Sequence, residues 1–237
     1  MVEGLIEQGV AYCKNGDFAK GVELFDRALA VSPNDLVALS NRARALSRIE
    51  RLEDSLIDFE KLVDLQPTNA QFVGDYAVAL HLNDRNDDAA EAFDKALSLE
   101  PENPFRYSSR AFFKDRIGDY EGALADYDHC IAMDPEDAIA LNNRGMVEEK
   151  MGYKERSKKS FDQSNQLMGY DPKAKAKKES DVQASNSSGE KSGPNLQAPK
   201  FESEVPPTRW GVIKSVFTKE GFKDFVQFSK GLVQKKD

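Results

Sequence analysis

The feature of this sequence that most constrains its fold is a period of 34 residues. Prolines stand 34 residues apart at Pro33, Pro67, Pro101 and Pro135. The same period carries an aromatic series at Phe25, Phe59, Phe93, Tyr127 and Phe161, and a series of small residues at Gly9, Ala43, Ala77, Ala111 and Gly145. Proline is only about 5% of an average protein, so its recurrence every 34 residues is not expected by chance. Composition also does not give three series of residues the same 34-residue spacing. The chain is therefore predicted to be built from repeated units.

Each unit is predicted to contain two helices. In the first unit apolar residues recur at helical spacing, at Leu5 and Tyr12 and again at Val22, Phe25 and Leu29. The turn signal Asn-Gly-Asp at 15–17 separates the two helices, and Ser-Pro-Asn-Asp at 32–35 ends the unit and caps the next. The small residues are expected to let the paired helices approach closely, with the aromatic beside them. One unit cannot bury its apolar face alone, so neighbouring units are expected to stack.

This pattern resembles the tetratricopeptide repeat (TPR) family, in which W-x₂-L-G-x₂-Y is followed by A-x₃-F and then P. The first unit matches it at Gly9, Tyr12, Phe25 and Pro33. The resemblance implies an all-α fold, a right-handed superhelical α-solenoid that occupies residues 1–171. Its five repeats are expected at 2–35, 36–69, 70–103, 104–137 and 138–171.

The second helix of the fifth repeat, expected at 154–167, departs from the pattern. It carries Ser157 and Ser164 where earlier repeats are mostly apolar or small. A terminal repeat needs a polar outer face because nothing stacks on it. We therefore interpret this helix as the C-terminal cap of the solenoid.

The resemblance also implies a ligand surface, because partners of TPR proteins usually lie against the concave side, formed by the first helix of each repeat. Phe112 and Met146 would hold apolar side chains, and amide groups such as Asn142 would pair with a peptide backbone, which predicts a peptide or helix of a protein partner. For any single residue a solvated helix face remains the alternative. The candidates are Ile6, Val10, Lys14, Asn41, Arg44, Arg48, Asp75, Val78, His81, Ser108, Ser109, Phe112, Asn142, Asn143 and Met146.

Some members of the family bind the C-terminal EEVD carboxylates of heat-shock chaperones through a Lys-Asn-Asn-Lys-Arg clamp over three repeats. In the first window of this chain the matching positions hold Ile6, Val10, Asn41, Gln71 and Asp75. Only Asn41 fits, and Asp75 would repel a carboxylate. The two later windows do not match either, so no EEVD carboxylate clamp is expected.

The sequence after the repeats divides into two segments. Residues 172–208 are rich in Ser, Lys, Glu, Gly and Pro and nearly lack large apolar residues, which predicts a disordered linker. Residues 209–237 contain seven Lys and Arg against three Asp and Glu, and are predicted to form a basic amphipathic helix. Its candidate anchor residues are Trp210, Ile213, Phe217, Phe222, Phe225 and Val226.

Three partners for this basic tail stay open: the repeats of its own chain, an anionic membrane surface and a separate protein. Residues 1–171 carry 20 Lys and Arg against 33 Asp and Glu, a net charge of −13 that would attract the tail. A basic helix with Trp and Phe on its apolar face also suits anionic lipid. Nucleic acid is an unfavoured partner, because lysines spread through an apolar helix form no continuous track for phosphates.

No catalytic or metal-binding motif is recognisable in the sequence. The two histidines, His81 and His129, and the two cysteines, Cys13 and Cys130, lack ligand spacing, and a phosphate-binding glycine loop, HExxH and GxSxG are absent. We expect no enzyme activity, no cofactor and no metal. The N-terminus lacks a signal-peptide pattern and no long apolar stretch follows, so a cytoplasmic location is expected.

The sequence predicts a protein-interaction adaptor or assembly scaffold whose tail either blocks the concave groove or anchors the scaffold. The alternative is a peripheral membrane-tethering protein, in which the tail binds anionic lipid while the repeats recruit a partner.

Overall fold

The computed structural model describes residues 2–169, which form α-helices and turns without a strand. The all-α solenoid expected from the repeat pattern is confirmed for this part of the chain. The helices are α1 (Val2–Lys14), α2 (Phe18–Val31), α3 (Leu36–Arg48), α4 (Leu52–Leu65), α5 (Ala70–Leu82), α6 (Asn86–Leu99), α7 (Pro104–Ile117), α8 (Tyr120–Met133), α9 (Ala138–Lys150) and α10 (Lys154–Leu167). The predicted linker at 172–208 and tail at 209–237, with its anchor residues, lie outside the described residues.

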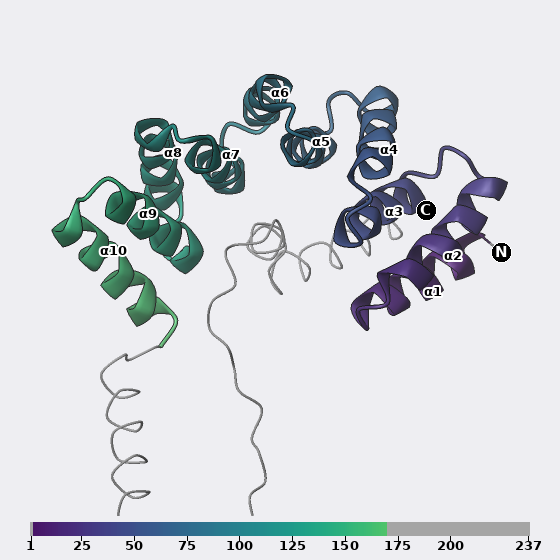
Figure 1. Ribbon diagram of the computed structural model, residues 1–237, viewed down its shortest axis with the longest axis horizontal. Coiled ribbons are helices and arrows are strands. Elements are labelled where there is room, and N and C mark those ends of the chain that lie inside the picture. The colour runs from purple at the N-terminus through teal and green to yellow at the C-terminus, as the bar shows by residue number, and fades with distance from the viewer. Residues whose placement is uncertain (1, 170–237) are drawn as a thin grey trace, which may run out of the picture.

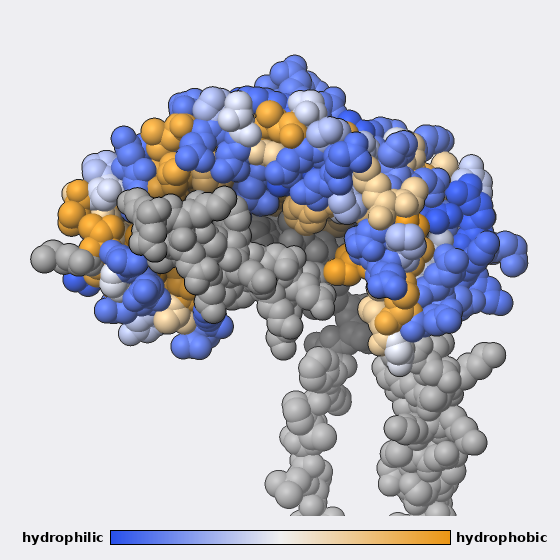
Figure 2. All heavy atoms as spheres, turned by 180° about the vertical axis from the view of Figure 1, so that it is seen from behind, coloured by the Kyte–Doolittle hydropathy of each residue, from blue (hydrophilic) through white to orange (hydrophobic). Residues whose placement is uncertain are grey.

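The helices form consecutive pairs that stack into an arch (Figure 1). The odd-numbered helices α3, α5, α7 and α9 lie on the inner side of this arch, and their even-numbered partners lie on the outer side (Figure 1). Odd-numbered helices of successive pairs also contact one another, as α5 does α7 and α7 does α9. The inner surface is therefore made by the first helix of each pair. Seen from behind, the molecule is mostly hydrophilic, with apolar side chains in separate groups (Figure 2).

The turn inside each pair uses the same left-handed backbone position. Its φ is 87° at Gly16, 89° at Gly118 and 81° at Gly152. The second and third pairs have Glu50 at φ 62° and Asp84 at φ 61° there. Glycine adopts this conformation without steric cost, whereas a side chain bearing Cβ does not. These five residues are spaced by 34, so one turn geometry recurs along the chain.

The junction between pairs is set by side-chain caps that also follow the period. Asp35, Asn69, Asn103 and Asp137 stand two residues after the prolines, and each accepts a hydrogen bond from a backbone N–H in the first turn of the next odd-numbered helix. Such caps satisfy donors that have no partner within the helix. Every pair from the second onward therefore begins at a capping Asp or Asn that can be recognised in the sequence two residues after a proline.

The two helices of the first and last pairs approach closely at glycine. A Cβ built on Gly9 would lie 2.6 Å from the ring of Phe25, and one on Gly145 would lie 2.8 Å from the ring of Phe161. Phe25 is fully buried. The small and aromatic series of the sequence thus meet in the first and last pairs, as expected.

The last described helix, α10, is polar at positions where the earlier even-numbered helices are apolar. On the earlier even-numbered helices the face toward the next pair carries apolar residues at two repeated positions: first Val22, Leu56, Ala90 and Leu124, then Leu29, Val63, Leu97 and Ile131. In α10 these positions hold Lys158 and Asn165. A further pair would find no apolar surface at these two positions, and the role of α10 as the C-terminal cap stays a prediction.

The serines of α10 do not lie on the outer face of the helix. Ser157, Ser160 and Ser164 are buried against α9. The Ser160 hydroxyl donates to Glu148 at 2.7 Å, and the Ser164 hydroxyl donates to the carbonyl of Ala138 at 2.7 Å. Their polarity is therefore satisfied inside the fifth pair, and the polar outer face comes from other residues of the helix.

Candidate functional site

The inner surface has a polar part that crosses from α3 to α5. The guanidinium of Arg44 lies 2.5 Å from a carboxylate oxygen of Asp75, and both side chains are mostly covered. The amide of Gln71 donates to the other Asp75 oxygen at 3.0 Å. The two charges of the ion pair largely cancel, so Asp75 does not present an isolated negative charge to a ligand.

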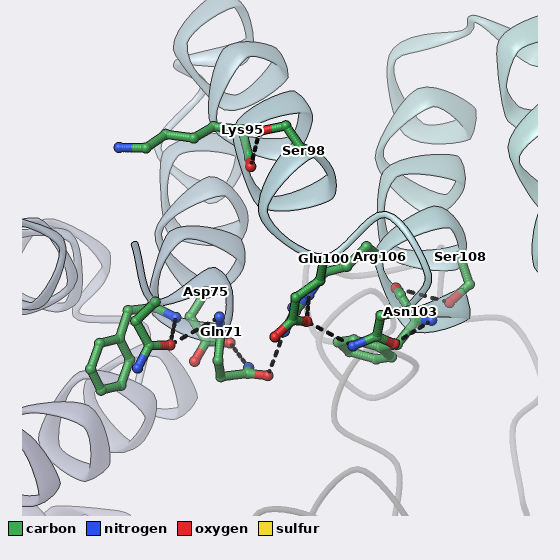
Figure 3. Close-up of polar contacts among 11 residues, drawn as sticks. Gln71, Asp75, Lys95, Ser98, Glu100, Asn103, Arg106 and Ser108 are labelled. Carbon is green, nitrogen blue, oxygen red and sulfur yellow. Dashed lines mark hydrogen bonds and ion pairs between the residues drawn. The ribbon is translucent and has the colours of Figure 1, made fainter. Parts of the chain in front are cut away.

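This polar network continues from α5 to α7 (Figure 3). Arg106 donates from Nη2 to Oε1 of Gln71 at 3.3 Å and from Nε to Oε2 of Glu100 at 2.8 Å. Asn103 donates to the same Glu100 oxygen at 2.8 Å. Arg106 is only 5% exposed. A Cβ at position 74 would lie 3.0 Å from this guanidinium, so Gly74 leaves the room that Arg106 occupies.

The electrostatics of Glu100 follow from these contacts. Partial burial by itself raises the pKa of this carboxyl, but hydrogen bonds from Arg106 and Asn103 and the nearby guanidinium charge outweigh it. The pKa of Glu100 is therefore lowered from its ordinary value. The network joins three successive repeats, and its buried guanidinium is held by structural contacts.

Several candidates on the first three odd-numbered helices are already engaged. Ile6 and Asn41 are buried, and the Asn41 amide donates to the carbonyl of Val37 at 2.7 Å. The guanidinium of Arg48 lies 5.4 Å from the ring centroid of Phe18. Val10 and Val78 are partly buried in core clusters, whereas Lys14 is exposed.

His81 also has structural partners. Its Nδ1 lies 2.7 Å from the amide oxygen of Asn86, and its ring meets Phe113 edge-on with centroids 5.3 Å apart. The other histidine, His129, stacks on Tyr107 with centroids 5.1 Å apart. Among residues 2–169 no group of histidine, cysteine and carboxylate side chains is arranged to hold a metal ion.

An apolar strip lies on α7 and α9, and we call Phe105, Phe112, Ile139 and Met146 the inner strip. Phe105 is 47% exposed, Met146 46% and Ile139 39%, and Phe112 is half-buried. The spacing of seven residues on each helix puts its two members on one face. The residues beside the strip are buried, at Ala111 and Phe113 on α7 and at Ala140 and Val147 on α9. The strip is therefore the solvent side of two neighbouring inner helices.

Polar candidates accompany the strip at the predicted places. Ser108, Ser109, Asn142 and Asn143 are half-buried on the same two helices, between the apolar members. Phe105 and Ile139 were not among the predicted site residues. Their signal was present in the sequence, because they stand 34 residues apart at the second position of successive odd-numbered helices, as Phe112 and Met146 do near the middle.

An ion pair lies beyond Phe112 and Met146, at the end of the strip near the C-termini of α7 and α9. The ammonium of Lys150 on α9 lies 2.6 Å from a carboxylate oxygen of Asp115 on α7. The same ammonium lies 5.7 Å from the ring centroid of Tyr120. This pair links the two inner helices, and Lys150 is not a free cation for a carboxylate ligand.

The outer side carries a second kind of polar element, which is structural. Arg42 on α3 donates to both oxygens of Asp58 on α4, at 2.7 and 2.6 Å, and to Asp26 on α2 at 2.6 Å. Arg110 makes the same three bonds to Asp126 and Asp94. A small cavity of about 120 Å³ beside Arg42 is lined by Asp26 and Asp58 and also by apolar side chains, Val22, Leu46 and Ile57 among them. We interpret both arginines as bridges between adjacent pairs.

The comparisons with known proteins agree with the repeat pattern. Residues 6–70 and 40–104 match the family model described as tetratricopeptide repeat. The chain is 33% identical over 60 residues to the protein STIP1 homolog of Dictyostelium discoideum, and 39% identical over 64 residues to the Hsp70-Hsp90 organizing protein of Triticum aestivum. These matches cover 25% and 27% of this chain and span 11% of the length of each relative.

Three solved structures share the fold. A tetratricopeptide repeat protein from Parabacteroides merdae matches with a TM-score of 0.65 and 18% identity, covering 72% of this chain and 66% of that chain. A thermophilic TPR protein of Thermus thermophilus matches at 0.62 and 16%, covering 77% and 100%. YrrB, a TPR protein with an unusual peptide-binding site, matches at 0.52 and 15%, covering 69% and 84%.

No helix within residues 2–169 has the length and apolar character that crossing a membrane requires. The paired-helix arch is the fold of the solved structures that the chain matches. Residues 6–104 match the tetratricopeptide repeat family, and the described helices have the fold of solved tetratricopeptide repeat proteins.

Proposed function

We propose that this chain is a protein-interaction adaptor that binds a peptide or a helix of its partner along the inner strip. The observation that carries the proposal is the exposure of Phe105, Ile139 and Met146 on adjacent inner helices. Large apolar side chains grouped on one exposed surface mark interaction sites more often than isolated ones do. Asn142 and Ser108 between them supply hydrogen-bonding groups for a backbone.

The class of ligand follows from the charges of this surface. Arg44 is paired with Asp75 and Lys150 with Asp115. Asn41, the only residue that fits the EEVD clamp, is buried and bonded within its own helix. A ligand held by apolar side chains is therefore favoured over one held by a terminal carboxylate. YrrB, which has the same fold, has an unusual peptide-binding site, and this likeness supports a peptide as ligand.

The proposal is tested by selecting peptides that bind the full-length chain from a random library displayed on phage. Selected peptides are then measured against the wild type, a Phe105→Ser/Met146→Ser variant and an Ile57→Ser control. Ile57 is 61% exposed on the outer helix α4, so the control removes an exposed apolar side chain elsewhere. We expect at least a tenfold loss of affinity, about 1.4 kcal/mol, in the strip variant alone. Equal binding to all three proteins would reject the strip as the site.

The alternative function is a peripheral membrane tether. The observation that favours it is the basic, aromatic-rich sequence of residues 209–237, which lies outside the described residues. The test is sedimentation of the full-length chain with vesicles containing anionic lipid at low salt, with neutral vesicles as the control. Sedimentation that depends on the tail supports the tether, and its absence at low salt removes this alternative.

A further inference from the structure

We propose that residues 209–237 of the same chain bind the inner strip of α7 and α9 and thereby occupy the adaptor's own ligand site. This inference rests on the proposed function, because it takes the strip as a binding surface. It adds the identity of one ligand and a regulatory consequence: a partner has to displace the tail.

The first argument is where the described chain ends. The Ser164 hydroxyl donates to the carbonyl of Ala138, so the end of α10 lies beside the beginning of α9. Ile139, a member of the inner strip, is the next residue. The chain therefore leaves the repeats next to one end of the strip.

The second argument is the length of the connection. Thirty-nine residues, 170–208, separate the last described residue from the tail. A flexible chain of this length has a root-mean-square span of about 30–35 Å, and such tethers give effective concentrations near the millimolar range. Even a weak interaction with the strip is then largely formed within one molecule.

The third argument excludes the most obvious competing surface on the repeats. The tail could stack on α10 as a sixth unit would, but that face carries Lys158 and Asn165 in place of the apolar residues of earlier pairs. Burying these polar groups under an apolar helix would cost free energy without a compensating partner. The inner strip is apolar and exposed, and its member Ile139 follows the residue that the end of α10 contacts.

The fourth argument is complementary chemistry. The tail contains one tryptophan and four phenylalanines, which match the apolar strip, and it carries seven basic residues against three acidic ones. Exposed carboxylates stand at both ends of the strip: Glu102 and Glu136 each precede a strip residue by three positions, and Glu149 follows Met146 by three. Opposite charges around an apolar centre favour this pairing over a neutral or acidic helix.

The test uses the fluorescence of Trp210, the single tryptophan of the chain. In the dilute full-length protein we expect an emission maximum well to the blue of that of the denatured protein. Phe105→Ser/Met146→Ser should shift the maximum toward the denatured value, while Ile57→Ser leaves it unchanged. Circular dichroism confirms that each variant remains folded.

Several outcomes would overturn the proposal. A red emission maximum in the wild type means that the tail is free, and a blue shift that then appears only with anionic vesicles assigns it to a membrane. A blue maximum that both variants retain places Trp210 on another surface. A blue maximum that is lost on dilution assigns the contact to a second copy of the chain.

A photo-crosslinking amino acid at position 105 keeps the test decisive if the double variant does not fold. We expect crosslinks from position 105 into residues 209–237 of the same molecule and none from the control position 57. Crosslinks from neither position would reject the contact.

The peptide assay separates failure of this inference from failure of the adaptor function. A Trp210→Ser/Phe222→Ser variant should bind strip-selected peptides at least tenfold more tightly than the wild type, because the competing tail is weakened. Unchanged affinity refutes self-occupancy and leaves the adaptor function standing. Loss of strip-dependent peptide binding in every variant refutes the adaptor function itself.

Discussion

At the scale of single residues, the repeat is enforced by backbone conformation and by caps. Three of the five turns inside the helix pairs have glycine at the left-handed position, and two do not. Glu50 is exposed, so no packing of its side chain offsets the steric cost of its φ of 62°. The second turn is thus built like the first, but from a less suitable residue.

Replacing Glu50 with glycine should stabilise the protein by about 0.5–1 kcal/mol, because glycine removes the steric penalty of this conformation. Chemical denaturation monitored by circular dichroism measures the change. The reverse substitution at the equivalent site, Gly118→Ala, should destabilise by a similar amount. A destabilising Glu50→Gly would show that the turn is not strained.

Glu100 provides a prediction about pH. Its pKa is lowered in the folded chain, so it contributes stability above the unfolded-state pKa of about 4.3, and this contribution disappears as pH falls through the folded-state pKa. We expect Glu100→Gln to destabilise the protein near pH 6 and to have a smaller effect near pH 3. Unfolding titrations at several pH values measure this, with Glu102→Gln as the control for loss of a charge in the same turn. An effect of Glu100→Gln that does not change with pH would contradict the assignment.

At the scale of helices, the arginine bridges occur in some repeats, and other residues take the same positions in another repeat. Arg42 and Arg110 each hold a buried aspartate of their own pair, Asp58 or Asp126, and an exposed aspartate of the preceding pair. In the intervening third repeat the equivalent arginine and buried aspartate are replaced by Tyr76 and Ala92. Polar bridging and apolar packing are therefore alternative ways to fill the same position.

This substitution pattern can be copied into the second repeat. Arg42→Tyr alone should destabilise the protein by about 2–4 kcal/mol, because it leaves the carboxylate of Asp58 buried without its main partner. Adding Asp58→Ala, as in the third repeat, should restore most of that loss. Thermal unfolding of the single and double variants measures the coupling. Additive losses would mean that the two residues do not act as a pair.

At the scale of the whole molecule, the apolar core is divided along the arch. One cluster spans the first two pairs and reaches α5, a second lies in α5 and α6, and a third lies in α7 to α9. Phe113 of α7 belongs to the second cluster, where it stacks on Phe93 with centroids 4.9 Å apart. This side chain and the Arg106 network carry the connection between the third and fourth repeats.

Phe113→Ala should therefore uncouple the last two repeats from the first three, at a cost of about 3–5 kcal/mol. Hydrogen exchange should show faster exchange in α7 to α10 than in α1 to α4. Phe112→Ala is the matched control, because the neighbouring ring lies on the inner strip and not in the core, so its removal should leave exchange nearly unchanged. Uniform acceleration in all helices would indicate one cooperative unit.

Much of this architecture was predictable from local signals. Helix pairs, the Asn-Gly-Asp turn, the capping Asp35 and the polar last helix each depend on residues close in sequence, so periodicity and turn chemistry identify them. The inner surface was predicted as a face, and Phe112 and Met146 stand on it. Phe105 and Ile139 were missed although their 34-residue spacing was visible, because helical position shows where a side chain points and not how much of it neighbouring helices cover.

By itself, then, the amino-acid sequence determined the unit, its two helices, the boundaries that proline and the caps impose, and the polar character of α10. Only the tertiary structure decided that Asn41 is buried, that Asp75 is neutralised by Arg44, and that Arg106 joins the fourth repeat to the third. The physical reason is that these properties depend on how successive pairs are rotated against one another. That rotation brings side chains of residues 31 or 35 positions apart in the sequence within hydrogen-bonding distance of each other. The same rotation leaves the inner strip uncovered on the described surface.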